Sequence, residues 1–154
     1  MALKVGDVVP SFTAQTTDGS VFDSNEYLGK KALVVYFYPK DNTSVCTAQA
    51  CSFRDQYEDF RTFGAEVIGV SSDSIRSHQN FANQYRLPFI LLSDSKKQLR
   101  KLFGVPNDYL GLIPGRVTYV IDTAGIIQLV FDSTSGPIHI KKALDCIKKI
   151  NGKS

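Results

Sequence analysis

Two cysteines, Cys46 and Cys51, lie five residues apart, just after an apolar run with the length and composition of a buried strand. A loop separates that run from an expected helix. Cys46 falls in the first turn of this helix, where Asn42 and Thr43 are natural N-cap residues. The unpaired N–H groups and the positive dipole end of a helix N-terminus both favour a thiolate over a thiol. The pattern therefore indicates a nucleophilic cysteine, although a lone cysteine there could equally be buried filler.

The spacing of the two cysteines bears on redox chemistry. In an ideal helix, residues five apart differ by about 7.5 Å in rise and ~140° in rotation, which places their Cα atoms ~8.7 Å apart. A disulfide bridges Cα atoms up to about 7 Å apart, so this pair forms one only if the first helical turns unwind. This suits oxidation of Cys46 to a sulfenic acid that Cys51 then attacks. The competing interpretation is two unrelated helix cysteines, with Cys51 in the core beside Ala50 and Phe53.

Strand-like and helix-like runs alternate along the chain. The expected strands are 32–38, 66–70 and 89–92, the expected helices are 45–63, 74–86, 94–103 and 137–150, and the expected hairpins are 11–24 and 116–131. Early parallel crossovers followed by a hairpin and a final helix predict an α/β fold, with a mixed central sheet flanked by helices. A thioredoxin-like sandwich with an N-terminal β-hairpin satisfies this order. A Rossmann domain is disfavoured because no glycine-rich dinucleotide turn follows the first long strand.

Composition limits the classes of protein to consider. The length of 154 residues predicts one domain spanning 1–154, and the 43% hydrophobic content is typical of a globular protein. A dispersed net charge of +3 argues against nucleic acid as a partner. No apolar run reaches the ~18 residues of a membrane span. Three cysteines and no recognisable targeting segment favour the cytoplasm, and a mature plastid protein without its transit peptide would look the same.

The segment 37–55, FYPKDNTSVCTAQACSFRD, closely resembles the active-site segment of peroxiredoxins. Its C-x4-C spacing resembles that of the bacterioferritin-comigratory or peroxiredoxin Q group. The resemblance covers nearly the whole chain and includes the segments 5–12, 64–70, 86–94 and 112–122. It implies a thioredoxin-dependent peroxidase that reduces hydrogen peroxide and organic hydroperoxides to water or alcohols.

The resemblance also implies a role for each matching residue. Cys46 would attack the peroxide as a thiolate, and Cys51 would resolve the resulting sulfenic acid as an intramolecular disulfide. Pro39 would shield the thiolate from water, and the Thr43 hydroxyl would hydrogen-bond the thiolate and the peroxide. Arg116 would fix the thiolate and stabilise charge as the O–O bond breaks, which is electrostatic preorganisation around an activated nucleophile.

Partners and cofactors follow from the same resemblance. A thioredoxin-like dithiol would reduce the disulfide, and no metal, haem or flavin would be needed. Both cysteines lie in one chain, so a monomer is expected.

The family usually has Pro-Gly before the attacking cysteine, where this chain has Ser44-Val45. We expect that change to affect the rate and the size of accepted substrates, and not the reaction.

Three other functions remain open from the residues alone. A thiol–disulfide oxidoreductase would use C-x-x-C at a helix start, which this chain lacks. A metal-binding module could draw on three cysteines and two histidines, although no second ligand pair at zinc-site spacing is present. A peroxide sensor would use the same residues as a scavenger. Cys146 is interpreted as structural filler, and His78 and His139 as surface residues.

Overall fold

The computed structural model describes residues 2–105, 107–108, 113–133 and 135–151. The strands are β1 (Thr13–Thr16), β2 (Val21–Asp23), β3 (Ala32–Phe37), β4 (Ala65–Ser71), β5 (Ile90–Ser93), β6 (Asn107–Asp108), β7 (Ile113–Pro114), β8 (Val117–Ile121) and β9 (Ile127–Asp132). The helices are η1 (Ser24–Glu26, one 3₁₀ turn), α1 (Ser44–Asp55), α2 (Tyr57–Thr62), α3 (Ile75–Tyr85), α4 (Gln98–Phe103) and α5 (Gly136–Asn151).

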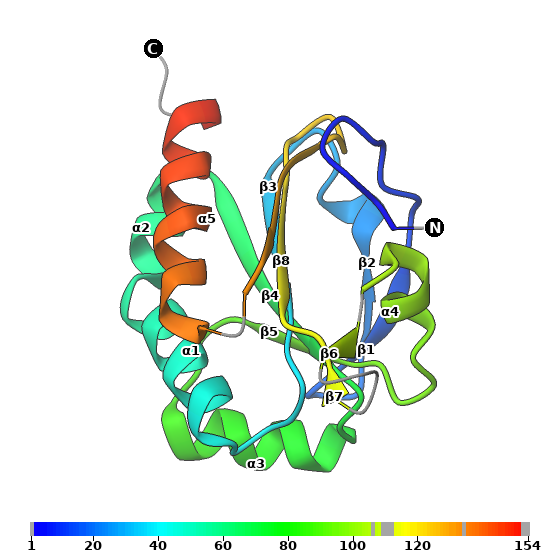
Figure 1. The fold of residues 1–154 in the computed structure, drawn as a ribbon, viewed down its shortest axis with the longest axis vertical. Coiled ribbons are helices and arrows are strands. Elements are labelled where there is room, and N and C mark those ends of the chain that lie inside the picture. The colour runs from blue at the N-terminus through cyan, green and yellow to red at the C-terminus, as the bar shows by residue number, and fades with distance from the viewer. Residues whose placement is uncertain (1, 106, 109–112, 134, 152–154) are drawn as a thin grey trace.

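Seven strands form one mixed sheet in the order β2-β1-β5-β4-β3-β8-β9. The central strands β3, β4 and β5 are parallel, because helices cross over between them, and β1, β8 and β9 join by antiparallel pairing. Figure 1 shows the sheet between α1, α2 and α5 on one side and α4 on the other. The predicted mixed sheet flanked by helices, with a hairpin (β1 and β2) near the N-terminus, is confirmed.

Apolar side chains gather on both faces of this sheet. Every residue of β3 and β4 is buried, as expected for parallel strands covered on both sides. One core cluster joins alternate β3 residues to α1, α3 and α5, and it includes Cys46, Ala50 and Phe53. The other lies toward α4 and includes Phe37 and Phe103. In the part of the chain that the structure describes, no helix has both the length and the apolar character needed to cross a membrane.

The predicted helix over 45–63 is two helices. Gln56, with φ −109° and ψ 11°, leaves the helical conformation and separates α1 from α2. No glycine or proline marks this break in the sequence, and the apolar spacing continues across it from Phe53 to Phe60. Gly64 follows α2 with φ 77°, as is typical of a glycine that ends a helix.

The prediction that both histidines lie at the surface is wrong, since each is fully buried. His78 precedes the buried Phe81 by three residues on α3, and His139 precedes the buried Ala143 by four on α5. Helical spacing therefore places each imidazole on the face that packs against the sheet. Both rings hydrogen-bond through both nitrogens, which makes their burial tolerable.

His139 is neutral in this environment. Its Nε2 donates to the Ser133 carbonyl at 2.8 Å, and its Nδ1 lies 2.8 Å from Thr118 Oγ1, which donates to it. Burial lowers the pKa of His139 from 6.5 to about 4, because desolvation disfavours the charged imidazolium.

Candidate active site

Cys46 is carried to the edge of the sheet by the loop between β3 and α1. β3 ends at Phe37, and residues 38–43 lead into α1, whose first residue is Ser44 and whose N-cap is Thr43. Asn42 lies in this loop with φ 63°, a left-handed conformation that asparagine tolerates better than most residues. Cys46 follows in the first turn of α1, as predicted, and its side chain is buried.

Arg116 contacts the Cys46 thiol directly. Its Nη2 donates to Cys46 Sγ at 3.2 Å across 70 residues of sequence. The sheet register accounts for this meeting, because Val117 of β8 pairs with Phe37 of β3. Arg116 therefore lies at the end of β3 where the loop to α1 begins. The buried guanidinium therefore places a positive charge directly against the sulfur.

Gln49 is a site residue that the sequence interpretation missed. It lies one turn after Cys46 on α1, is fully buried, and accepts a 2.5 Å hydrogen bond from Arg116 Nη1 through Oε1. Its position three residues after the nucleophile was the available signal, since residues at that spacing share a helix face. Gln49 thus orients the guanidinium toward the sulfur.

Two buried N–H groups of the site residues lack a hydrogen-bond partner. Among the described residues, nothing accepts a hydrogen bond from Gln49 Nε2 or Arg116 Nε. Unpaired buried donors are rare and cost free energy, so they usually mark a place where a ligand or water binds. Gln49 and Arg116 therefore have donors available for a ligand oxygen.

The Thr43 hydroxyl does not bond the thiol in this structure. Its Oγ1 donates to the Lys40 carbonyl at 2.9 Å, within the loop that precedes α1. That contact uses the hydroxyl proton and leaves the oxygen lone pairs to accept a hydrogen bond from a peroxide. Pro39 is half-buried at the start of the same loop.

Cys51 lies on the same unbroken helix as Cys46, and both are free thiols. Five helical residues turn their side chains about 140° apart, and Cys51 is half-buried where Cys46 is buried. Cys146, the third cysteine, packs against the core from α5. Burial raises the pKa of Cys146, which keeps it a thiol.

Tyr36 lies beneath the site with its hydroxyl fully buried. Burial raises the pKa of Tyr36 well above its usual value of 10, and the neighbouring Cys46 and Asp41 raise it further. The phenol therefore stays protonated. Tyr36, Tyr38 and Cys46 belong to one core cluster, and the Tyr38 hydroxyl donates to Asp41, so the thiol and the Asp41 carboxylate lie on the same side of the sheet.

Val45 faces the start of α5. Its side chain is 41% exposed, and its Cγ1 would lie 3.1 Å from a methyl group placed on Gly136. That methyl group would also lie 2.9 Å from Gln49 Cβ and 2.9 Å from the Val45 carbonyl oxygen. The first turn of α1 therefore packs directly against a glycine at the start of α5.

We expect Gly136→Ala to disturb both stability and activity. The added methyl group must push α1 from α5, which costs about 1–3 kcal/mol of unfolding free energy. It also displaces Gln49 and so Arg116, which we expect to lower kcat/KM for peroxide about 10-fold. Chemical denaturation and steady-state kinetics measure the two effects, with the exposed neighbour Ser135→Ala as control. Unchanged kinetics in Gly136→Ala would show that Gln49 does not orient the arginine.

The cysteines do not take part in a metal-binding cluster. Among the described residues, one group of side chains has the ligand atoms and proximity to hold a metal ion, namely Asp41, Asp73 and His78. It contains no cysteine, and the second histidine lies elsewhere on α5. The interpretation as a cysteine–histidine metal module therefore gains no support.

Comparison with known proteins bears on the chemistry of this site. A sequence profile described as the AhpC/TSA family matches residues 5–130. Peroxiredoxin Q, chloroplastic, from Populus jackii is 47% identical over 146 residues, which cover 94% of this chain and 68% of that protein. The crystal structure of peroxidoxin BcpB from Mycobacterium tuberculosis is 34% identical, with a TM-score of 0.90 and 99% of each chain covered.

A third similar protein was solved in trapped intermediate and ligand complexes that address its alkyl peroxide reduction activity. It is the bacterioferritin comigratory protein of Xanthomonas campestris. It is 27% identical to this chain, with a TM-score of 0.84, and the match covers 91% of this chain and 92% of that one.

Proposed function

Because the chain belongs to the AhpC/TSA family and is a thiol-dependent peroxidase of the peroxiredoxin Q type, we propose that Cys46 is its peroxide-attacking thiolate. The observation that carries this assignment is the 3.2 Å contact from Arg116 Nη2 to Cys46 Sγ. A buried cation against one thiol out of three singles that thiol out as the nucleophile.

In the first step, the Cys46 thiolate attacks the terminal peroxide oxygen. An S–O bond forms while the O–O bond breaks, and the departing oxygen takes a proton and leaves as water or an alcohol. Cys46 becomes a sulfenic acid. Arg116 and Gln49 offer their unpartnered N–H groups to the peroxide oxygens as negative charge moves between them. The Thr43 oxygen accepts a hydrogen bond from the peroxide O–H.

In the second step, Cys51 attacks the sulfenic sulfur. The S–S bond forms and water leaves, which gives an intramolecular Cys46–Cys51 disulfide. Because the two side chains are turned about 140° apart on α1, the first turns of that helix unwind before this bond forms. A thioredoxin-like dithiol then reduces the disulfide by thiol–disulfide exchange.

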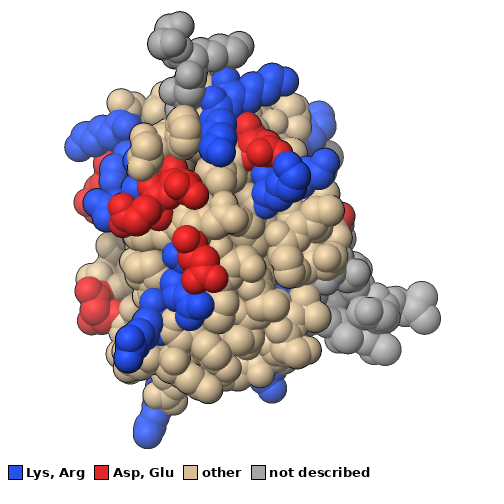
Figure 2. Space-filling view, turned by 90° about the vertical axis from the view of Figure 1, so that its left-hand side faces the viewer, with Lys and Arg blue, Asp and Glu red and all other residues tan. Residues whose placement is uncertain are grey.

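The proposal extends to the substrates, the assembly state and the compartment. Val45 and Ile138 are exposed apolar residues in the first turns of α1 and α5, which suits organic hydroperoxides as well as hydrogen peroxide. Figure 2 shows charges of both signs intermixed over the upper and left parts of the face that carries α1, α2 and α5, and few charges at its lower right. The chain would work as a monomer and a single domain over 1–154. The chloroplastic relative favours a plastid over the cytoplasm.

The test couples peroxide consumption to thioredoxin, thioredoxin reductase and NADPH. We expect the protein to oxidise one NADPH for each hydrogen peroxide or cumene hydroperoxide consumed. Peptide mapping of the oxidised protein without reductant should find Cys46 linked to Cys51. No peroxide consumption would refute the activity, and a Cys46–Cys146 link would refute the assigned second step.

A further inference from the structure

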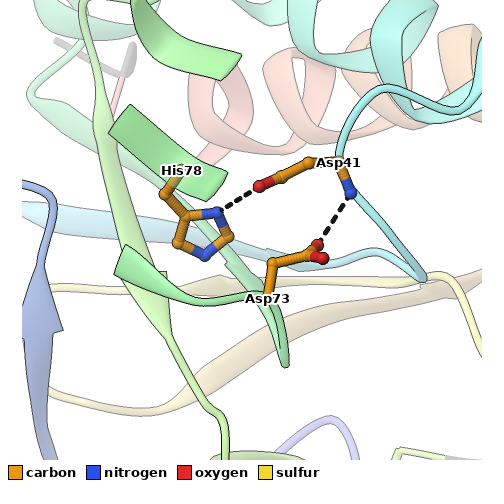
Figure 3. A group of neighbouring side chains, drawn as sticks. All are labelled: Asp41, Asp73 and His78. Atoms are coloured by element: carbon orange, nitrogen blue, oxygen red, sulfur yellow. Dashed lines mark hydrogen bonds and ion pairs between the residues drawn. The ribbon is translucent and has the colours of Figure 1, made fainter. Parts of the chain in front are cut away.

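A buried polar cluster lies beside the thiol site and takes no direct part in its chemistry. Its centre is Asp41, in the loop between β3 and α1, with a side chain only 1% exposed. Asp41 Oδ1 accepts a 2.6 Å hydrogen bond from the Tyr38 hydroxyl. Asp41 Oδ2 accepts from His78 Nδ1 at 2.7 Å and from Ser77 Oγ at 2.8 Å. Figure 3 shows Asp41 held between His78 of α3 and Asp73.

The backbone of Asp41 is held as well. Its N–H donates to Asp73 Oδ2 at 2.7 Å, and Ser71 Oγ donates to the same oxygen at 2.8 Å. Ser71 is the last residue of β4, and Asp73 follows it. Because β3 and β4 are adjacent parallel strands, their following loops meet at one edge of the sheet. We call Asp41, Asp73, Ser77 and His78 the Asp41 clamp.

Protein hydrogen bonds occupy both the Asp41 carboxylate and the His78 ring. His78 Nδ1 lies 2.7 Å from Asp41 Oδ2, and its Nε2 lies 2.9 Å from the Leu92 carbonyl oxygen. The Tyr38 and Ser77 hydroxyls also donate to Asp41. Partners within the fold therefore occupy the atoms with which this group could otherwise hold a metal ion.

Asp41, the centre of the clamp, lies in the loop that also carries two assigned site residues, Pro39 and Thr43. Asp41 is two residues after Pro39 and two before Thr43, and the intervening Asn42 has the left-handed φ of 63°. Thr43 turns its hydroxyl back to the Lys40 carbonyl. Within this short loop, hydrogen bonds tie both the side chain and the backbone of Asp41 to other parts of the fold.

We propose that His78 and Asp73, acting through Asp41, are positioning residues for peroxide reduction. They fix the loop that carries Pro39 and Thr43, the two residues before α1 that have assigned roles beside Cys46. They do not contact the thiol itself, which accepts a hydrogen bond from Arg116, and Arg116 in turn donates to Gln49. This inference rests on the proposed function, since it gives His78 a role in the reaction assigned to Cys46.

The experiment compares two reactions of the same thiol. Peroxide reduction needs the loop, whereas alkylation of Cys46 by iodoacetamide needs only the thiolate. For His78→Gln we expect the second-order rate constant with hydrogen peroxide to fall about 10- to 100-fold, since misplacement by about 1 Å has effects of that size. The alkylation rate, followed by mass spectrometry on the Cys46 peptide, should change less than about 3-fold. Ser77→Ala, which removes one hydrogen bond to Asp41, should show a smaller loss of the same kind.

The matched control is Tyr57→Phe. Tyr57 also donates to a buried carboxylate, Glu66 Oε1 at 2.7 Å, and Glu66 lies near the opposite end of β4 from Ser71. This variant should lose stability and keep the wild-type ratio of the two rates. A wild-type ratio in His78→Gln would overturn the inference, and it would leave the peroxidase function standing because wild type is assayed alongside.

A measurement on the unmodified protein keeps the inference testable if the His78 variant does not fold. Nitrogen-15 NMR at pH 7.5 should find a proton on His78 Nδ1, because that nitrogen faces the Asp41 carboxylate at 2.7 Å. His139 is the internal control, because burial lowers its pKa to about 4 and its ring is neutral at this pH. A His78 Nδ1 without a proton would overturn the inference, because His78 would then not donate to Asp41.

Discussion

Replacing Cys46 with serine is expected to abolish peroxide turnover, because a serine hydroxyl does not form the required anion near neutral pH. Replacing Cys51 with serine is expected to leave one peroxide reduced per chain and then stop, since the sulfenic acid has no resolving thiol. Rapid-quench kinetics with dimedone trapping measure both outcomes. Dimedone should label Cys46 in Cys51→Ser, and it should label nothing in Cys46→Ser.

Cys146→Ser is the matched control for these two variants. Cys146 is half-buried like Cys51, but it packs against the core from α5. Because burial raises the pKa of its thiol, we expect Cys146→Ser to turn over at the wild-type rate. Full multiple turnover by Cys51→Ser would reject Cys51 as the resolving thiol and transfer that role to Cys146 or to an external thiol.

Replacing Arg116 with methionine is expected to lower kcat/KM for peroxide by about 10²–10³-fold, the usual cost of removing one preorganised donor from a charged transition state. Methionine keeps much of the side-chain volume and removes the cation. The alkylation rate of Cys46 should fall too, because the thiolate loses its 3.2 Å partner. Arg116→Met should therefore lower both the peroxide rate and the alkylation rate of Cys46. Variants of the Asp41 clamp should lower the peroxide rate and leave the alkylation rate nearly unchanged.

Two further variants sharpen the test of Arg116. Arg116→Lys should recover only part of the activity, because one ammonium group does not reach the sulfur and Gln49 Oε1 in the fixed geometry of a guanidinium. Arg54→Met is the control, since Arg54 lies two turns after Cys46 on α1 and donates to the Tyr85 carbonyl at 2.8 Å. Wild-type kinetics in Arg116→Met would reject charge stabilisation by this residue.

Much of the fold could be predicted because its signals are local. The unbroken β-branched and aromatic run over 32–38 has the composition of a strand buried on both faces, and β3 occupies that place. The helical pattern over 137–150 likewise located α5. The break at Gln56 was missed because the same apolar spacing runs through it. The two histidines were misplaced because the polar residues around them in the sequence were weighed above helical phase.

The candidate site, too, could be predicted only where its sequence signals are local. The place of Cys46 in the first turn of a helix follows from local pattern alone. Its meeting with Arg116, 70 residues away, depends on the pairing of β3 with β8, and only the family resemblance anticipated it. Asp41 and His78 are 37 residues apart and meet because β3 and β4 are adjacent. Parallel neighbours with polar residues after each strand were the signal that could have revealed that pair.

The packing of α1 has a consequence for the redox balance of the protein. Ala50 and Phe53 are fully buried on this helix. They stay buried only while the turns of α1 that carry Cys46 and Cys51 remain helical. Packing free energy therefore stabilises the dithiol relative to the disulfide, which raises the reduction potential of the couple. For two electrons, about 1.4 kcal/mol corresponds to about 30 mV. A reductant that restores the thiols is thus assisted by the refolding of α1, and a loosely packed helix would leave the disulfide harder to reduce.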